Sequence, residues 1–244
     1  MELTALRTLI ILLELTCILL SSSLVIVFSR VYKTKNSLFL LFIPLGFFFL
    51  TASYFFLFTH HILYVLSENI SSFYNLSISS PLMWMRSLAQ TIGFVLIGLS
   101  YFFAGKYQNE TKHGYLAIFS ASTVLLLLVL GLLFIINPIG LQSIYLNNSL
   151  FAIANIGLIS FIIFFLLRKL SIERDRAKAL SISILAFCSL LISQLLFIYY
   201  SFVENSPFIV IQSQIARIVS FALLLIMFYT AAKEVSTDYC CTSQ

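Results

Sequence analysis

The sequence predicts an all-α membrane protein: a bundle of seven transmembrane helices with the N-terminus outside and the C-terminus in the cytoplasm. Three observations support this prediction. Hydrophobic residues make up 61% of the 244 residues and charged residues only 9%, against roughly a quarter charged in a soluble domain. Seven apolar runs have about the 20 residues that a helix needs to cross the hydrocarbon core. Most Lys and Arg residues lie in alternate connections between these runs and in the tail.

The seven runs form one predicted transmembrane domain, residues 1–232, and residues 233–244 form a short cytoplasmic tail. Each run must be helical, because backbone N–H and C=O groups find no water partners in lipid. The first run begins close to Met1 and carries Glu14, so it is not expected to be a cleaved signal peptide. The predicted spans are residues 8–29, 37–62, 82–104, 115–136, 150–167, 179–202 and 208–232.

The basic residues between the spans set the predicted orientation. The first, third and fifth connections and the tail hold eleven of the fourteen Lys and Arg residues, whereas the second, fourth and sixth connections hold none. Cytoplasmic loops carry this excess, and anionic lipid headgroups account for the net charge of +5 without a nucleic acid partner. The residues are Arg30, Lys33, Lys35, Lys106, Lys112, Arg168, Lys169, Arg174, Arg176, Lys178 and Lys233.

Two segments, 80–106 and 206–233, indicate an internal repeat. Each begins with Ser at an expected N-cap and Pro at the expected first helical position, and each ends with Lys. Aligning Ala89 with Ala216 produces five identities over nineteen positions. The repeat predicts a 3+1+3 layout, in which the first three spans correspond to the last three.

Seven polar side chains inside the spans form the candidate site. A charge at the centre of a membrane helix costs about 2.5 to 3.5 kcal/mol on insertion scales, so these side chains need partners. A helical rise of about 1.5 Å per residue places them in the outer half of the membrane. The residues are Glu14, Arg86, Gln90, Asn155, Gln194, Gln214 and Arg217.

The spacing of these residues predicts that they face the bundle interior. Arg86 and Gln90 share one helix face, and so do Gln214 and Arg217. Glu14 is the only carboxylate inside a span at a depth similar to that of Arg217, so the two are expected to pair. Three interpretations remain open: a structural network between helices, an outward-facing pocket for a small or lipidic ligand, and a transport vestibule. The inner half offers hydroxyl groups but no charged relay, which disfavours an ion or proton path.

No residue is assigned to catalysis, to a metal or to a cofactor. The sequence lacks the HExxH, Gly-x-Ser-x-Gly and GxGxxG motifs, so the protein is not expected to be an enzyme. His60 and His61 fall at the outer rim of the second span and are interpreted as interfacial residues. Microbial rhodopsins attach retinal to a Lys in the middle of the seventh helix, where this chain has Arg217, so covalent retinal binding is not expected.

The segment RSLAQTIGFVLIGLSYFFAGK, residues 86–106, resembles one helix of the seven-helix sensor modules that precede kinase or cyclase domains in prokaryotic signalling proteins. The resemblance implies a receptor-like sensor or accessory protein in the cell membrane. Such a protein recognises a small or lipidic ligand, or senses the bilayer, and signals through a cytoplasmic or membrane protein partner. Two alternatives remain, a small-solute transporter of 3+1+3 layout and a structural subunit of a membrane complex.

Overall fold

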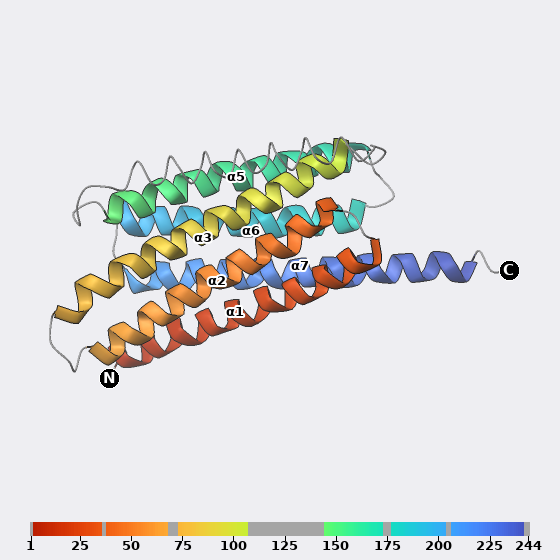
Figure 1. The fold of residues 1–244 in the computed structure, drawn as a ribbon. Coiled ribbons are helices and arrows are strands. Elements are labelled where there is room, and N and C mark those ends of the chain that lie inside the picture. The colour runs from red at the N-terminus through yellow and green to blue at the C-terminus, as the bar shows by residue number, and fades with distance from the viewer. Residues whose placement is uncertain are drawn as a thin grey trace.

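The computed structural model describes residues 2–35, 38–67, 73–106, 144–172, 177–203 and 206–241. These residues form an elongated bundle of six long helices (Figure 1). All six are nearly continuous apolar segments, as expected where lipid replaces water around the backbone. The helices are α1 (Glu2–Lys35), α2 (Leu38–Ser67), α3 (Phe73–Lys106), α5 (Ile144–Ile172), α6 (Ala177–Phe202) and α7 (Pro207–Cys241).

Each of the six helices contains a segment that is long and apolar enough to cross a membrane. These segments confirm six of the predicted spans and identify the chain as a multi-pass integral membrane protein. The seventh predicted span, residues 115–136, lies outside the described residues. The segments are Ala5–Val31, Leu41–Leu63, Pro81–Phe102, Leu150–Ile172, Ala177–Tyr200 and Pro207–Tyr229.

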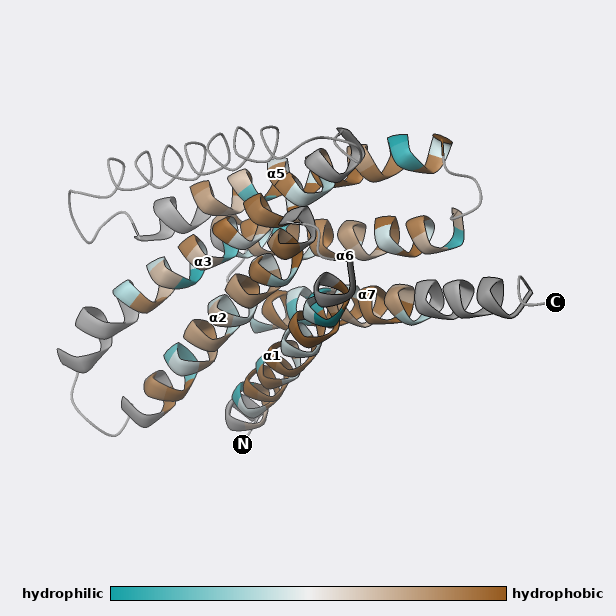
Figure 2. Ribbon diagram, turned by 45° about the vertical axis from the view of Figure 1, so that its right-hand side comes forward, coloured by the Kyte–Doolittle hydropathy of each residue, from teal (hydrophilic) through white to brown (hydrophobic). Residues whose placement is uncertain are grey.

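The outward faces of the helices match a lipid environment. Large apolar side chains are exposed on them, including Leu19 at 60% and Phe164 at 61%. Figure 2 shows hydrophobic colours along the length of every described helix. Exposed apolar surface of this extent is costly in water and neutral in hydrocarbon, so the bundle is suited to a bilayer.

Two helix boundaries differ from the prediction. Helix α7 does begin at Pro207, and the carbonyl of Ser206 accepts a hydrogen bond from the Ile209 N–H at 3.1 Å. Pro81, in contrast, lies inside α3, which begins at Phe73. A membrane helix tolerates an internal proline when its neighbours satisfy the freed carbonyl. The Ser-Pro pair therefore marks a helix start in only one of the two related segments.

Helix α7 also continues to Cys241, beyond its predicted end at residue 232. Residues 230–241 contain neither Gly nor Pro, the residues that most readily end a helix. Figure 1 shows α7 extending past the ends of the other helices.

The six helices pack in a ring that follows the chain order. Successive helices are neighbours, α3 packs against α5, and α1 packs against α7 to close the ring. Figure 1 shows α1, α3, α5 and α7 running in one direction and α2 and α6 in the other. One end of the ring, here the cation-rich end, carries Arg30, Arg168, Lys169 and Lys178. The opposite end, here the histidine end, carries His60 and His61 near the end of α2.

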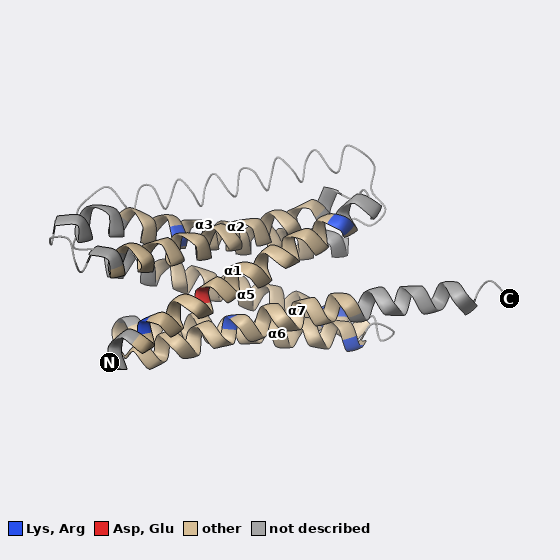
Figure 3. Cartoon of the chain, turned by 90° about the horizontal axis from the view of Figure 1, so that it is seen from below, with Lys and Arg blue, Asp and Glu red and all other residues tan. Residues whose placement is uncertain are grey.

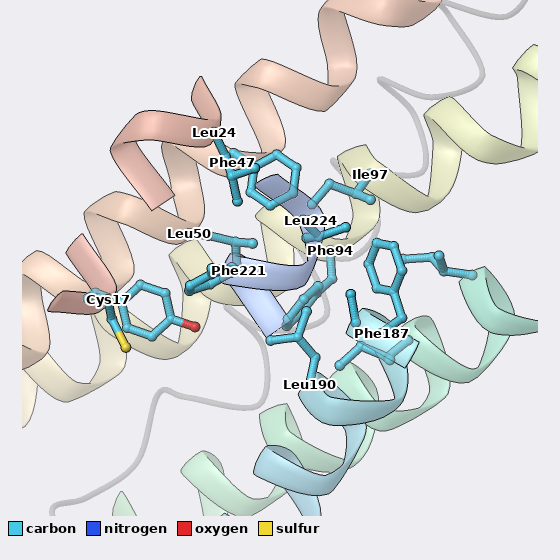
Figure 4. Close-up of a cluster of buried hydrophobic side chains, with 14 of the residues drawn as sticks. Cys17, Leu24, Phe47, Leu50, Phe94, Ile97, Phe187, Leu190, Phe221 and Leu224 are labelled. Carbon is cyan, nitrogen blue, oxygen red and sulfur yellow. The ribbon is translucent and has the colours of Figure 1, made fainter. Parts of the chain in front are cut away.

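The described charged residues are sparse along the bundle, as Figure 3 shows. Away from the histidine end, the helices are held together by apolar packing. Side chains from α1, α2, α3, α6 and α7 point toward one another in this core (Figure 4). Its members include Leu24, Phe47, Leu50, Phe94, Ile97, Phe187, Leu190, Phe221 and Leu224.

Helices α2 and α3 approach most closely where two glycines meet. A Cβ atom on Gly93 would lie 2.8 Å from the carbonyl oxygen of Gly46, and a Cβ on Gly46 would lie 2.8 Å from that of Gly93. Neither carbonyl can move without moving its helix. Small residues of this kind let membrane helices pack backbone against backbone, so this pair sets the separation of α2 and α3.

Candidate functional site

The seven polar residues predicted from the sequence are all buried in the described bundle. Their exposed fractions do not exceed 4%. They come from five helices and lie in the part of the bundle toward the histidine end, with Arg217 near the middle of its span. We call these seven residues the polar layer: Glu14, Arg86, Gln90, Asn155, Gln194, Gln214 and Arg217.

Glu14 of α1 is joined to two other helices. The Nδ1 atom of His61 on α2 lies 2.7 Å from Glu14 Oε1, and Nε2 of Gln214 on α7 donates to the same oxygen at 3.3 Å. The second oxygen of the carboxylate, Oε2, is buried and has no hydrogen-bond partner among the described residues.

Arg217 does not form the predicted direct pair with Glu14. Its Nε donates to Ser193 Oγ at 2.7 Å, and its Nη1 donates to Gln214 Oε1 at 3.3 Å. The amide of Gln214 therefore lies between the two charges, accepting from Arg217 through its oxygen and donating to Glu14 through its nitrogen. Sequence separation along α7 explains the difference: Gln214 is one turn nearer the histidine end than Arg217, at the level of the carboxylate.

Hydroxyl and aromatic groups complete the surroundings of Arg217. The Oγ atoms of Ser193 and Ser213 lie 3.0 Å apart, and Ser213 donates to the Ser193 carbonyl at 3.1 Å. The guanidinium carbon lies 5.7 Å from the ring centroid of Tyr54, a distance at which a cation is attracted to an aromatic face. Arg217 thus links α6 and α7 and contacts α2.

A separate contact joins α3 to α5. Thr91 Oγ1 lies 2.9 Å from Asn155 Oδ1 and 3.0 Å from the carbonyl of Ser87. All three residues are buried. Asn155 therefore acts with Thr91, and within the described residues no hydrogen bond ties it to the chain of groups that runs from His61 to Arg217.

The remaining three residues of the polar layer have buried nitrogen atoms that find no hydrogen-bond partner in the described bundle. These atoms are Arg86 Nε, Gln90 Nε2 and Gln194 Nε2. The guanidinium carbon of Arg86 lies 4.9 Å from the ring centroid of Phe197, and its Nη1 lies 3.9 Å from Met83 Sδ. Both contacts are weak in comparison with a carboxylate partner. Arg86 is thus a buried cation that the described residues leave without an anion.

Sequence reasoning missed His61 as the partner of Glu14. His61 lies near the end of the Leu41–Leu63 segment, as the sequence predicted, and 28% of its side chain is exposed. A position near the end of a span does not by itself reveal the contact with Glu14. Matching the depth of Glu14 in α1 with that of His61 in α2 is the signal that could have identified this contact. Ser193 and Ser213 carried no signal, because hydroxyl groups are common in membrane helices.

The arrangement provides hydrogen bonds and positive charge. Arg86, Arg217 and Glu14 are the charged side chains buried in the described interior, which leaves one excess positive charge when His61 is neutral. Within the same residues, no group of three or more His, Cys, Asp or Glu side chains could hold a metal ion.

The comparisons with known proteins do not assign this chain to a family. The resemblance of residues 86–106 to prokaryotic sensor modules stays a prediction. No protein-family model, curated protein or solved structure matches this chain.

Proposed function

We propose that this protein is a receptor-like membrane sensor that binds a small ligand in the polar layer. The observation that carries the proposal is the unused hydrogen-bonding capacity of buried groups: Glu14 Oε2, Arg86 Nε, Gln90 Nε2 and Gln194 Nε2 have no hydrogen-bond partner within the part of the chain that the structure describes. A structural network satisfies its members, because each unpaired buried polar group costs about 1 to 3 kcal/mol. Groups that stay unsatisfied in the free protein are those that a ligand can satisfy.

The ligand enters from the outer side in this proposal. The cation-rich end faces the cytoplasm by the distribution of Lys and Arg, which puts the histidine end outside. His61 is partly exposed and touches Glu14, so the polar layer begins at the surface of that end. Signals leave through the opposite end, to a cytoplasmic or membrane protein partner in the cell membrane.

A seventh crossing at residues 115–136 belongs to the same proposal. Helices α3 and α5 run in the same direction (Figure 1), which supports an additional crossing between them. The ring order also favours the 3+1+3 layout, because α3 and α7 occupy opposite positions in it. With this crossing, four helices run in one direction and three run in the other.

A carrier for small solutes is the competing function, and the ring order favours it. Carriers with parallel repeats bind their substrate near the centre of such an arrangement. The apolar core of Figure 4 lies between the polar layer and the cation-rich end. A solute would have to displace buried rings such as Phe94 and Phe221, which is why we favour a sensor. A structural subunit of a larger complex is the third alternative.

Native mass spectrometry of the protein, released gently from lipid nanodiscs, distinguishes the three functions. A small molecule that stays bound and is lost in Gln90→Leu and Gln194→Leu variants supports the sensor. A stoichiometric protein partner with no small molecule would favour the structural subunit. Uptake of that molecule into proteoliposomes would favour the carrier.

Cysteine labelling tests the orientation. Val203 and Ser171 are exposed residues at opposite ends of the bundle. In a cysteine-free background on intact cells, a membrane-impermeant maleimide should label Val203→Cys and leave Ser171→Cys unlabelled until the cells are opened. The reverse pattern would invert the topology and move the ligand site to the cytoplasmic side.

A further inference from the structure

We infer that Arg86, Gln90 and Gln194 form a binding site for an oxyanion, a carboxylate or a phosphate group. This inference rests on the proposed function, because it names the chemical class of the ligand in the polar layer. The three side chains are each at most 4% exposed. Each presents an N–H donor that has no hydrogen-bond partner among the residues that the structure describes.

The three residues lie on facing surfaces of α3 and α6. Arg86 and Gln90 are four residues apart and therefore share a face of α3, while Gln194 and Phe197 are three apart and share a face of α6. The contact of Arg86 with the Phe197 ring brings these faces together. Because α3 and α6 run in opposite directions (Figure 1), Gln90 and Gln194 are both about one turn deeper than that contact.

Charge selects an anion rather than a neutral ligand. The carboxylate of Glu14 contacts His61 and accepts a hydrogen bond from Gln214, and no contact among the described residues joins it to Arg86. The described interior therefore holds two guanidinium groups and one carboxylate. One monovalent anion beside Arg86 brings the buried charge to zero.

Geometry selects an oxyanion among anions. A guanidinium group presents parallel N–H donors that match the oxygens of a carboxylate or a phosphate. Two side-chain amides add further N–H donors at fixed positions, and oxygen atoms accept from several donors at once. The anion can come from a soluble acid or from a lipid headgroup, since both carry the same oxygens.

The test uses the full-length protein in nanodiscs and follows its thermal unfolding. The probes are sodium acetate and sodium phosphate in phosphatidylcholine nanodiscs, and nanodiscs that contain phosphatidylglycerol without either salt. Sodium chloride at equal ionic strength is the control. At concentrations well above the Kd, each tenfold increase in the concentration of the anion that binds should raise the Tm of the natural sequence by roughly 3 to 6 °C. A response to the salts identifies a soluble anion, and a response to phosphatidylglycerol alone identifies a lipid headgroup.

Two variants separate the site from general charge effects. Arg86→Met should abolish the rise while keeping or raising the Tm without anion, because it removes an unpaired buried cation. Arg30→Gln removes an exposed cation near the other end of the bundle and should keep the full rise. A lower Tm of Arg86→Met without anion, together with an unchanged anion response, would show that Arg86 is structural and overturn the site.

The failure of this inference is distinguishable from failure of the proposed function. An uncharged ligand that raises the Tm equally in the natural sequence and in Arg86→Met would retain the sensor and overturn the oxyanion. If none of these probes raises the Tm, the oxyanion site would also be overturned. The sensor itself is overturned if the native mass spectra show no bound small molecule, or if proteoliposomes take up the molecule that binds.

Discussion

The two halves of this bundle are held together by different physics. Toward the histidine end, Glu14, His61, Gln214 and Arg217 form a chain of polar contacts across α1, α2 and α7. Toward the cation-rich end, rings and aliphatic side chains fill the interior: Phe28 and Phe47 stack with centroids 5.3 Å apart, and Tyr54 meets Phe221 edge-on at 5.6 Å.

The difference shows where the membrane constrains the fold and where it does not. Lipid tails are as apolar as leucine, so the apolar half gains stability from shape and close packing. Lipid cannot replace the contacts of the polar half, because each charge there needs a polar partner. Specific recognition is therefore expected in the polar half, and rigidity in the apolar half. Three predictions test this comparison.

The largest effect is expected from Glu14→Gln. The substitution leaves Arg86 and Arg217 buried without a carboxylate among the described residues, and breaking a buried ionic arrangement typically costs about 3 to 5 kcal/mol. The free energy of unfolding, measured by SDS titration, should fall by about that amount. Adding Arg217→Met should recover part of the loss, since it removes one of the two cations. Losses that simply add in the double variant would show that charge balance does not govern the polar half.

An intermediate effect is expected from Gly93→Ala in the apolar half. The new Cβ would lie 2.8 Å from the Gly46 carbonyl oxygen and 3.0 Å from Leu50 Cγ, and overpacking of this kind costs about 1 to 3 kcal/mol. Gly157→Ala is the matched control, because nothing lies within 4 Å of its Cβ position. It should leave unfolding unchanged or strengthen the helix by up to about 1 kcal/mol. Equal effects of the two substitutions would show that the close approach of Gly93 to Gly46 does not constrain the packing of α2 against α3.

The smallest effect is expected from Phe47→Leu, at about 1 kcal/mol, because the ring is 2% exposed and stacks on Phe28. Its neighbour Phe48 is 56% exposed and should accept leucine with no measurable change in the Tm in detergent, since lipid or detergent replaces the lost contacts. A loss at Phe48 as large as that at Phe47 would mean that Phe48 packs against a protein partner.

The sequence predicted the helices better than their contacts. Six spans followed from hydropathy alone, because the lipid requirement leaves no alternative to a helix. The burial of polar residues such as Arg217 followed from the cost of exposing them to hydrocarbon. Their partners did not follow: a helix such as α2, apolar on all sides, carries no period that reveals its rotation. The contact of His61 with Glu14 and the approach of Gly46 to Gly93 both depend on that rotation.

Helix ends were equally hard to locate from the sequence. Ser80 and Pro81 have the residue types of a helix start, yet α3 begins at Phe73, because proline also fits inside a membrane helix. Ser206 and Pro207 have the same types and do begin α7. No local preference of the Ser-Pro pair itself distinguishes these two cases.

The uninterrupted length of α7 has a mechanical consequence. Its 35 residues form a rod of roughly 52 Å at about 1.5 Å per residue, against a hydrocarbon core of about 30 Å. No Gly or Pro interrupts it between Phe208 and Cys241, so it has no hinge at which to absorb a tilt. When α7 tilts slightly about Arg217, the whole helix therefore moves as a rigid rod, and the displacement grows toward Cys241.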